Sequence, residues 1–127
     1  MYLVKPNQLA DVWPLVHAWI ERAMDCSTGD ENSLDVLIAI AREQYFLFHE
    51  PDKFAAVAQI QNHPRHKICF VAYVGGTDLR LIKESFHNVL FPWAKKLGCY
   101  AVRCCGRSGW RRVMDMYDVG TALQLNL

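Results

Sequence analysis

One stretch, residues 68–97, constrains the fold more than any other part of the chain. An apolar run from Ile68 to Val74 is followed by Gly75-Gly76 and then by a long amphipathic pattern from about Leu79 to Leu97. The run predicts a buried strand, and the apolar side chains that recur every three or four residues after it predict a helix with one buried face. A strand that passes through glycine into a helix can present backbone N–H groups to a phosphate. Because the connection is short, an ordinary turn with Asp78 as helix N-cap is the favoured interpretation.

Length and charge narrow the class of protein. The chain has 127 residues, a hydrophobic share of 52% and a formal net charge of +1, which predicts one globular domain spanning residues 1–127. No apolar run is long enough to cross a membrane, and the N-terminus lacks the pattern of a secretory signal. The near-neutral charge gives no field that would recruit nucleic acid or anionic lipid. Five cysteines without a C-x-x-C pair indicate a reducing compartment and no disulfide framework.

The order of predicted elements defines the fold class. Short loops between three successive strands favour an antiparallel meander, and the long helix supplies a crossover to a parallel strand. The chain is therefore expected to be α+β, a mixed sheet flanked by helices in the order β-α-α-β-β-β-α-β-α-β. The predicted strands are 2–4, 45–48, 54–61, 68–74, 99–104 and 121–127, and the predicted helices end near 23 and 41 and span 79–97 and 110–117.

This order resembles the GNAT superfamily of N-acetyltransferases over essentially the whole chain. The local match is strongest in the C-terminal third, where Leu97-Gly98 ends the long helix and Gly106-Arg107-Ser108-Gly109-Trp110 opens a short one. The chain is also similar to small GNAT-like proteins of tailed-phage genomes, some of which are virion components. The resemblance implies a GNAT-like fold in a phage-type virion or assembly protein, located in the host cytoplasm or in the virion.

The cofactor loop departs from the family pattern. In the family an Arg/Gln-x-x-Gly-x-Gly/Ala loop wraps the pyrophosphate of acetyl-CoA, whereas residues 74–80 read Val-Gly-Gly-Thr-Asp-Leu-Arg and hold no such motif. No cofactor is therefore expected. The alternative is acetyl-CoA, and the resemblance then implies the following contact residues: Phe70, Val71, Ala72 and Tyr73 for the pantetheine arm, and Gly75, Gly76 and Thr77 for the phosphates.

The catalytic acid of the family is displaced in this sequence. The family places a Tyr four residues before a Gly on the short last helix, but Met116 holds that spacing from Gly120 and Tyr117 comes one residue later. One residue rotates a side chain by about 100° around a helix. If the chain is an enzyme, Tyr117 is the expected acid and Glu50 the expected base.

A cluster of cationic side chains offers a different site. Together with a tryptophan it could contact phosphates, an acidic protein surface or a stacked base, or it could be a solvated face neutralised by Asp115 and Asp118. The cluster consists of Arg103, Arg107, Trp110, Arg111 and Arg112.

Two functional hypotheses from different classes follow. The favoured one is a non-catalytic GNAT-like protein that binds other proteins, either phage structural proteins or a second copy of itself. The alternative is a divergent acyl-CoA-dependent N-acyltransferase. A nucleic-acid binder is the least favoured. No metal site is expected, because His49, Glu50 and Asp52 lack the i, i+4 spacing of helical zinc motifs, and His63 and His66 lack a third ligand.

Overall fold

A computed structural model describes residues 1–105, 108–120 and 123–127 of the chain. Its centre is a five-stranded sheet in the order β1-β2-β3-β4-β5. The first four strands pair antiparallel, and β5 runs parallel to β4. The α+β class, the meander and the crossover are confirmed. The strands are β1 (Tyr2–Leu3), β2 (Phe46–Glu50), β3 (Phe54–Asn62), β4 (Lys67–Gly76) and β5 (Cys99–Cys104).

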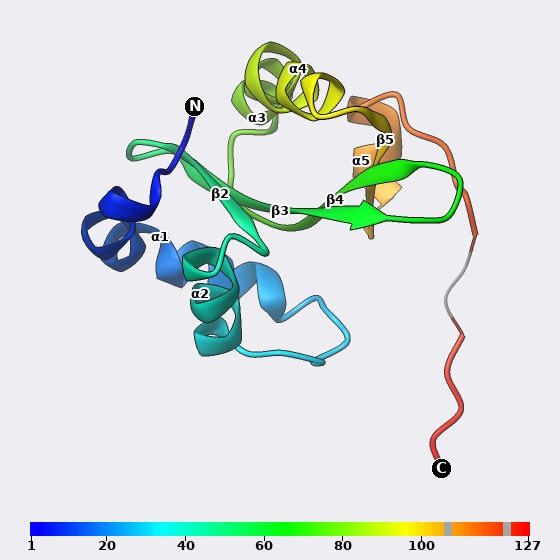
Figure 1. Cartoon of the computed structure of the whole chain (residues 1–127), viewed down its shortest axis with the longest axis horizontal. Helices are drawn as coiled ribbons and strands as arrows, with labels where there is room; N and C mark the ends of the chain where they lie inside the picture. The colour runs from blue at the N-terminus through cyan, green and yellow to red at the C-terminus, as the bar shows by residue number, and fades with distance from the viewer. Residues whose placement is uncertain (106–107, 121–122) are drawn as a thin grey trace.

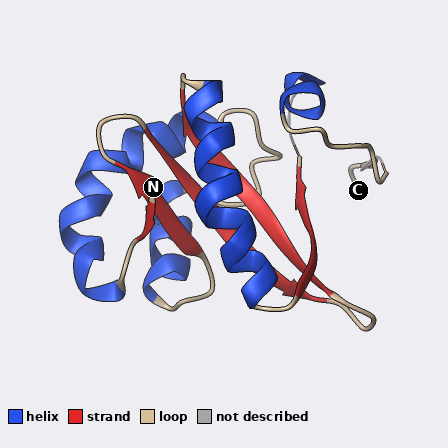
Figure 2. Cartoon of the chain, turned by 90° about the horizontal axis from the view of Figure 1, so that it is seen from above, coloured by secondary structure: helices blue, strands red, loops and turns tan. Residues whose placement is uncertain are grey.

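Helices cover both faces of the sheet (Figures 1 and 2). On one face lie α1 (Leu9–Met24), which follows a short 3-10 turn η1 (Pro6–Gln8), and α2 (Ser33–Ala41). The other face carries one continuous helical rod made of α3 (Leu79–Ser85), a π-helical turn η2 (Phe86–Leu90) and α4 (Phe91–Lys96). A short helix, α5 (Ser108–Val113), follows β5.

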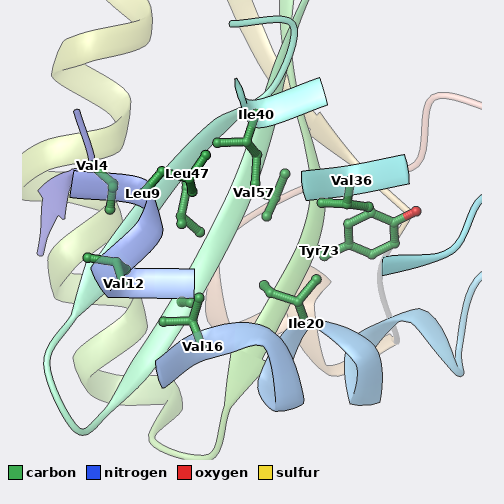
Figure 3. Close-up of a cluster of buried hydrophobic side chains, with 11 residues drawn as sticks. Val4, Leu9, Val12, Val16, Ile20, Val36, Ile40, Leu47, Val57 and Tyr73 are labelled. Atoms are coloured by element: carbon green, nitrogen blue, oxygen red, sulfur yellow. The ribbon is translucent and has the colours of Figure 1, made fainter. Parts of the chain in front are cut away.

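Two apolar cores lie on opposite faces of the sheet. The α1-side core joins Val12, Val16 and Ile20 of α1 to Leu47 and Val57 of the sheet (Figure 3). Because Val12, Val16 and Ile20 recur every four residues, they form one buried helix face. The core on the other face, the α3-side core, is built on aromatic and aliphatic side chains that include Phe48, Phe54, Ile82, Phe86 and Leu90.

The π-helical turn accommodates a proline within the helical rod. Pro92 lacks a backbone N–H group, and in a regular helix its ring would meet the carbonyl of residue 88. The wider turn at Phe86–Leu90 comes directly before it, so the backbone adapts and the helix continues to Lys96. The expected disturbance at Pro92 therefore takes the form of a change in helix type rather than an early end.

Two sequence expectations fail in this structure. Gly75 and Gly76 are the last residues of β4 and not a turn, because the strand stays paired with β3 up to Gly76. The final strand expected over 121–127 is absent from the described residues 123–127, which pair with no other segment. No helix in the described part of the chain is both long and apolar enough to span a membrane.

Candidate functional site

The two central strands separate before β4 ends. The parallel pairing of β4 with β5 stops at Val71 and Cys104, whereas β4 continues to Gly76 against β3 alone. An irregularity in the β3–β4 pairing falls at the same place, since the register steps from Val71 to Tyr73 and passes over Ala72. Such bulges bend a strand and increase its twist. Residues 72–76 therefore present an edge of backbone N–H and C=O groups that β5 does not pair.

A cavity of about 620 Å³ opens along this edge. We call it the β4–β5 cavity. One wall is β4 from Val71 to Gly76, and the opposite wall includes Val102 and Cys104 of β5. The helical rod contributes Ile82 and Phe86, and α1 contributes Trp19 and Arg22. The size and the largely apolar lining are typical of a small-molecule or cofactor site.

The glycine pair is explained by close packing rather than by phosphate binding. A Cβ atom on Gly75 would lie 2.4 Å from the backbone oxygen of Trp19 in α1. On Gly76 it would lie 2.4 Å from Cβ of Phe54 in β3. Both distances are far below van der Waals contact, so only glycine allows α1 and β3 to approach β4 this closely.

The connection between β4 and the helical rod contains a helix N-cap rather than a phosphate-binding loop. Only Thr77 and Asp78 separate β4 from α3. The backbone N–H of Leu81 donates to Asp78 Oδ1 over 3.1 Å, which makes Asp78 the N-cap. The sequence interpretation of Asp78 as a cap is confirmed.

The structure gathers most of the residues assigned to cofactor binding. Val71, Ala72, Tyr73, Gly75, Gly76 and Thr77 all line the β4–β5 cavity. Phe70 lies one residue earlier in β4, where the strand is still paired with Arg103 of β5, and it is not part of the lining.

The two residues assigned to catalysis lie outside the cavity. The side chain of Tyr117 is 82% exposed, and Met116 lines the cavity in its place, with its sulfur 3.9 Å from Sγ of Cys104. Glu50 ends β2 and contacts the amino group of Met1. Neither Tyr117 nor Glu50 is among the lining residues, so the structure does not bring the pair together at the cavity.

The cationic cluster is divided between the surface and the cavity. Arg103 is half-buried in β5, and Arg111 and Arg112 are exposed on α5. The guanidinium of Arg111 is 3.5 Å from the carboxylate of Asp118. Trp110 is half-buried, lines the cavity and has its ring centroid 6.2 Å from that of Phe86. Arg107 lies outside the described residues.

Sequence reasoning missed the contribution of α1. Trp19, Arg22 and Ala23 of α1 line the cavity, as does Cys26 just beyond the end of the helix. The spacing of three and four residues places the first three side chains on one helix face. This spacing is visible in the sequence and could have indicated that these residues share one face of the helix. Lys53, in the turn between β2 and β3, also lines the cavity and could not be assigned to it from local pattern.

A carboxylate that binds Tyr73, one of the lining residues, was missed as well. The hydroxyl groups of Tyr45 and Tyr73 donate to the same Glu31 oxygen over 2.8 and 2.6 Å. Burial and the hydrogen bond to Glu31 raise the pKa of Tyr45 to about 12, and the same two causes raise the pKa of Tyr73. These hydroxyls stay protonated at neutral pH and anchor the loop between α1 and α2 to the sheet.

The Cys104 thiol at the cavity is not activated. Burial raises the pKa of the Cys104 thiol, so it stays protonated and is a poor nucleophile. No disulfide joins any of the cysteines that the structure describes. Within the same residues, no group of three or more His, Cys, Asp or Glu side chains is placed to hold a metal ion.

Comparison with known proteins places the fold. No family model matches the chain, and no curated protein matches it either. Among solved structures, it resembles the aminoglycoside acetyltransferase meta-AAC0020 from an uncultured soil metagenomic sample, with a TM-score of 0.68, 7% identity and coverage of 99% of this chain and 94% of that one.

Two further enzymes share the arrangement. Glucosamine-6-phosphate N-acetyltransferase from Arabidopsis thaliana aligns with a TM-score of 0.58 and 10% identity over 98% of this chain and 95% of that one. An acetyltransferase from Trypanosoma brucei aligns with a TM-score of 0.57 and 14% identity over 99% and 97%. Together with the five-stranded mixed sheet and its flanking helices, these likenesses show that the chain has the fold of GNAT-type acetyltransferases.

Proposed function

We propose that the chain binds an acyl-coenzyme A in the β4–β5 cavity and transfers the acyl group to an amine. The observation that carries the proposal is the early end of the β4–β5 pairing, which leaves residues 72–76 with unpaired backbone groups beside a cavity of about 620 Å³. Buried or half-buried backbone groups need partners. The pantetheine arm of coenzyme A carries amide groups, and it can bind to such an edge as an added strand does.

The phosphate end of the ligand needs a positive partner that is not a glycine loop. Arg22 of α1 and Lys53 of the β2–β3 turn both line the cavity, and both are exposed enough to reach solvent. Arginine and lysine bind phosphate groups well at such rims. In this proposal they supply the attraction that the missing Arg/Gln-x-x-Gly-x-Gly/Ala motif supplies in the family.

Transfer requires the amine nitrogen to attack the thioester carbonyl. A C–N bond forms, the C–S bond breaks, and the thiolate of coenzyme A leaves and takes up a proton. Since Tyr117 and Glu50 do not line the cavity, the rate would depend mainly on holding the two reactants together. The apolar lining from Phe86, Phe91 and Trp110 would keep water away from the thioester.

Isothermal titration with acetyl-CoA tests the binding step. We expect one site with a dissociation constant in the micromolar range. Arg22→Glu and Lys53→Glu should each weaken binding by about tenfold or more, which corresponds to one lost charge-assisted contact. Lys83→Glu is the matched control, because Lys83 is exposed on α3, outside the cavity, and changes the net charge equally. Absence of binding by the unmodified chain would refute the proposal.

Gly76 is not a useful probe of this site. A bulky residue there would collide with Phe54, and the protein would lose stability whether or not it binds a ligand. Substitutions at the rim avoid this ambiguity.

A second candidate function is a GNAT-like protein that binds other proteins and catalyses no transfer. The observation in its favour is that Met116 occupies the cavity position beside Cys104 while Tyr117 is exposed. A phage-type virion or assembly role is the form that the sequence resemblance gives to this candidate. Titration with acetyl-CoA and release of free coenzyme A thiol in the presence of a panel of amines separate the two: turnover supports transfer, and the absence of both binding and turnover supports the second candidate.

A further inference from the structure

One hydrogen bond joins the linings of two cavities. Tyr73 of β4 lines the β4–β5 cavity, and its hydroxyl donates to Glu31 Oε1 over 2.6 Å. Glu31 does not line that cavity. It lines a second cavity, of about 800 Å³ on the α2 side of the sheet, together with Asp35 and Tyr45. The Tyr73–Glu31 hydrogen bond therefore links the proposed acyl-coenzyme A site to a separate, polar cavity.

The position of Glu31 is fixed from two directions. Glu31 precedes Asn32, the N-cap of α2, and Asn32 and Asp35 cap each other through two hydrogen bonds of 2.9 Å. The hydroxyl of Tyr45, just before β2, donates to the same Glu31 oxygen over 2.8 Å. Because a capping box holds the first turn of a helix in place, the Glu31 carboxylate stays at the end of the Tyr73 side chain.

The Glu31 carboxylate has no cationic partner. Among the residues that the structure describes, no lysine, arginine or histidine forms an ion pair with it. The groups that act electrostatically on Tyr73 are Glu31 itself, Tyr45 and Asp30, and none of them is cationic. A nearby cation would hold the carboxylate in its ionised form. Without one, the half-buried Glu31 can take a proton and release it to solvent through the second cavity.

Tyr73 can transmit a proton without becoming charged. Its side chain is 8% exposed, and Figure 3 shows its ring extending from β4 toward α2. Burial and the hydrogen bond to Glu31 raise the pKa of its hydroxyl, so a tyrosinate is unfavourable. A hydroxyl group can accept one proton while it donates another. A proton can therefore pass through Tyr73 while the side chain stays neutral.

We propose that Tyr73 and Glu31 form a proton relay for the amine that attacks the thioester, an inference that rests on the proposed acyl transfer. The lone pair of the amine nitrogen forms the C–N bond, and an N–H proton moves to the Tyr73 oxygen. In the same step the Tyr73 proton moves to Glu31 Oε1, and Glu31 later releases it to solvent. The C–S bond breaks, its electron pair leaves with sulfur, and the thiolate takes a proton from solvent. The relay supplies the base that Glu50 does not.

The test is the steady-state release of coenzyme A thiol from acetyl-CoA, with the primary amine that the unmodified chain uses best. Tyr73→Phe and Glu31→Gln should each lower kcat by about 100-fold, as the loss of a general base does. The KM for acetyl-CoA should change by less than about twofold, because neither variant removes a contact to the cofactor. Glutamine keeps an oxygen that accepts both tyrosine hydrogen bonds but takes no proton.

Tyr45→Phe is the matched control. It removes the other hydrogen bond to the same Glu31 oxygen and leaves the relay complete, so kcat should fall by less than about threefold. Melting temperatures measured by circular dichroism should shift by similar amounts in Tyr45→Phe and Tyr73→Phe, since each loses one hydrogen bond to Glu31. If Glu31→Gln does not fold, the comparison of the two tyrosine variants decides alone.

Each opposing outcome overturns the relay. Equal losses of kcat in Tyr45→Phe and Tyr73→Phe would show that both hydroxyls act only by anchoring the loop. A Glu31→Gln variant with the kcat of the unmodified chain would show that no proton moves to Glu31. In both cases the unmodified chain still transfers acyl groups, and the proposed function stands. Absence of turnover by the unmodified chain with every amine would overturn the proposed transfer itself, and the relay with it.

Discussion

The sheet is covered more completely at its centre than at its β5 edge. Over β2, β3 and β4, α1 and α2 bury Val16, Ile20, Leu47 and Val57 to 0% exposure. At the edge of the sheet, β5 has one strand neighbour among the described residues, and all of its own residues stay at least partly exposed. The first region is a fully buried hydrophobic core. The second region, around β5, lines the β4–β5 cavity.

We expect the covered region to determine the stability of the fold and the uncovered region to determine what the protein binds. A covered region holds the fold through buried apolar area, which is the dominant stabilising contribution. An uncovered region contributes less to stability and leaves backbone groups available to a ligand or another strand. The following substitutions test that division, beginning with the largest expected effect.

Truncation of a core side chain should distinguish the two regions most clearly. Ile20→Ala removes a side chain with 0% exposure from the α1-side core and should lower the free energy of unfolding by about 2–5 kcal/mol. Val102→Ala, at a half-buried position in β5, should cost about 1 kcal/mol or less. Urea denaturation followed by circular dichroism measures both. Equal losses would show that the two regions contribute alike.

The glycine that fits α1 against β4 provides the next test. Gly75→Ala places a Cβ atom 2.4 Å from the Trp19 backbone oxygen, and we expect a loss of about 2–3 kcal/mol from the forced separation of helix and strand. Gly29→Ala is the control, because nothing lies within 4 Å of its Cβ position and only its positive φ of 77° opposes alanine. About 1 kcal/mol is expected there. A harmless Gly75→Ala would contradict the packing explanation.

Most of the covered region could be predicted because its signals are local. The recurrence of Val12, Val16 and Ile20 specifies a buried helix face by itself, and the apolar run from Ile68 to Val74 specifies a buried strand. The C-terminal tail, residues 123–127, shows the limit of this approach. Its alternating leucines predicted a strand, but a strand forms only with a partner, and the local pattern does not say where that partner lies.

The candidate site was only partly predictable for the same reason. The resemblance to the GNAT family assigned Phe70–Tyr73 and Gly75–Thr77 to the cofactor, and six of these seven positions line the cavity. The role of Gly75 depends on the backbone of Trp19, and the role of Glu31 depends on two tyrosines in other strands or loops. Such contacts join segments far apart in sequence, and a single sequence carries no signal for them.

A buried histidine should make the stability of the covered region depend on pH. His49 is 3% exposed, with Nδ1 3.1 Å from the Tyr2 hydroxyl and with no hydrogen-bond partner at Nε2 among the described residues. Burial lowers its pKa below the ordinary value of 6.5, against the opposing charges of Glu50 and Asp52. The unfolded chain therefore binds the proton more readily, so the stabilisation is complete above pH 6.5 and is lost as pH falls through the folded pKa.

Denaturation midpoints at several pH values between 8 and 5 measure this loss. His49→Gln should reduce the pH dependence in this range, whereas His87→Gln, at an exposed position of the helical rod, should leave it unchanged. If His49→Gln shows the same pH dependence as the unmodified chain, other groups control the acid sensitivity.

The smallest expected effect lies at the boundary between the two regions, where Asp78 caps the helix that starts beside the cavity. Asp78→Ala removes the acceptor for the Leu81 N–H and should cost about 1 kcal/mol, whereas Asp78→Ser keeps a cap and should cost only a few tenths. Both variants remove a negative charge near the rim where phosphates would lie. If the cavity binds acetyl-CoA, both should bind it a few-fold more tightly, because that repulsion is lost. Stability that changes while affinity does not would assign Asp78 to the fold alone.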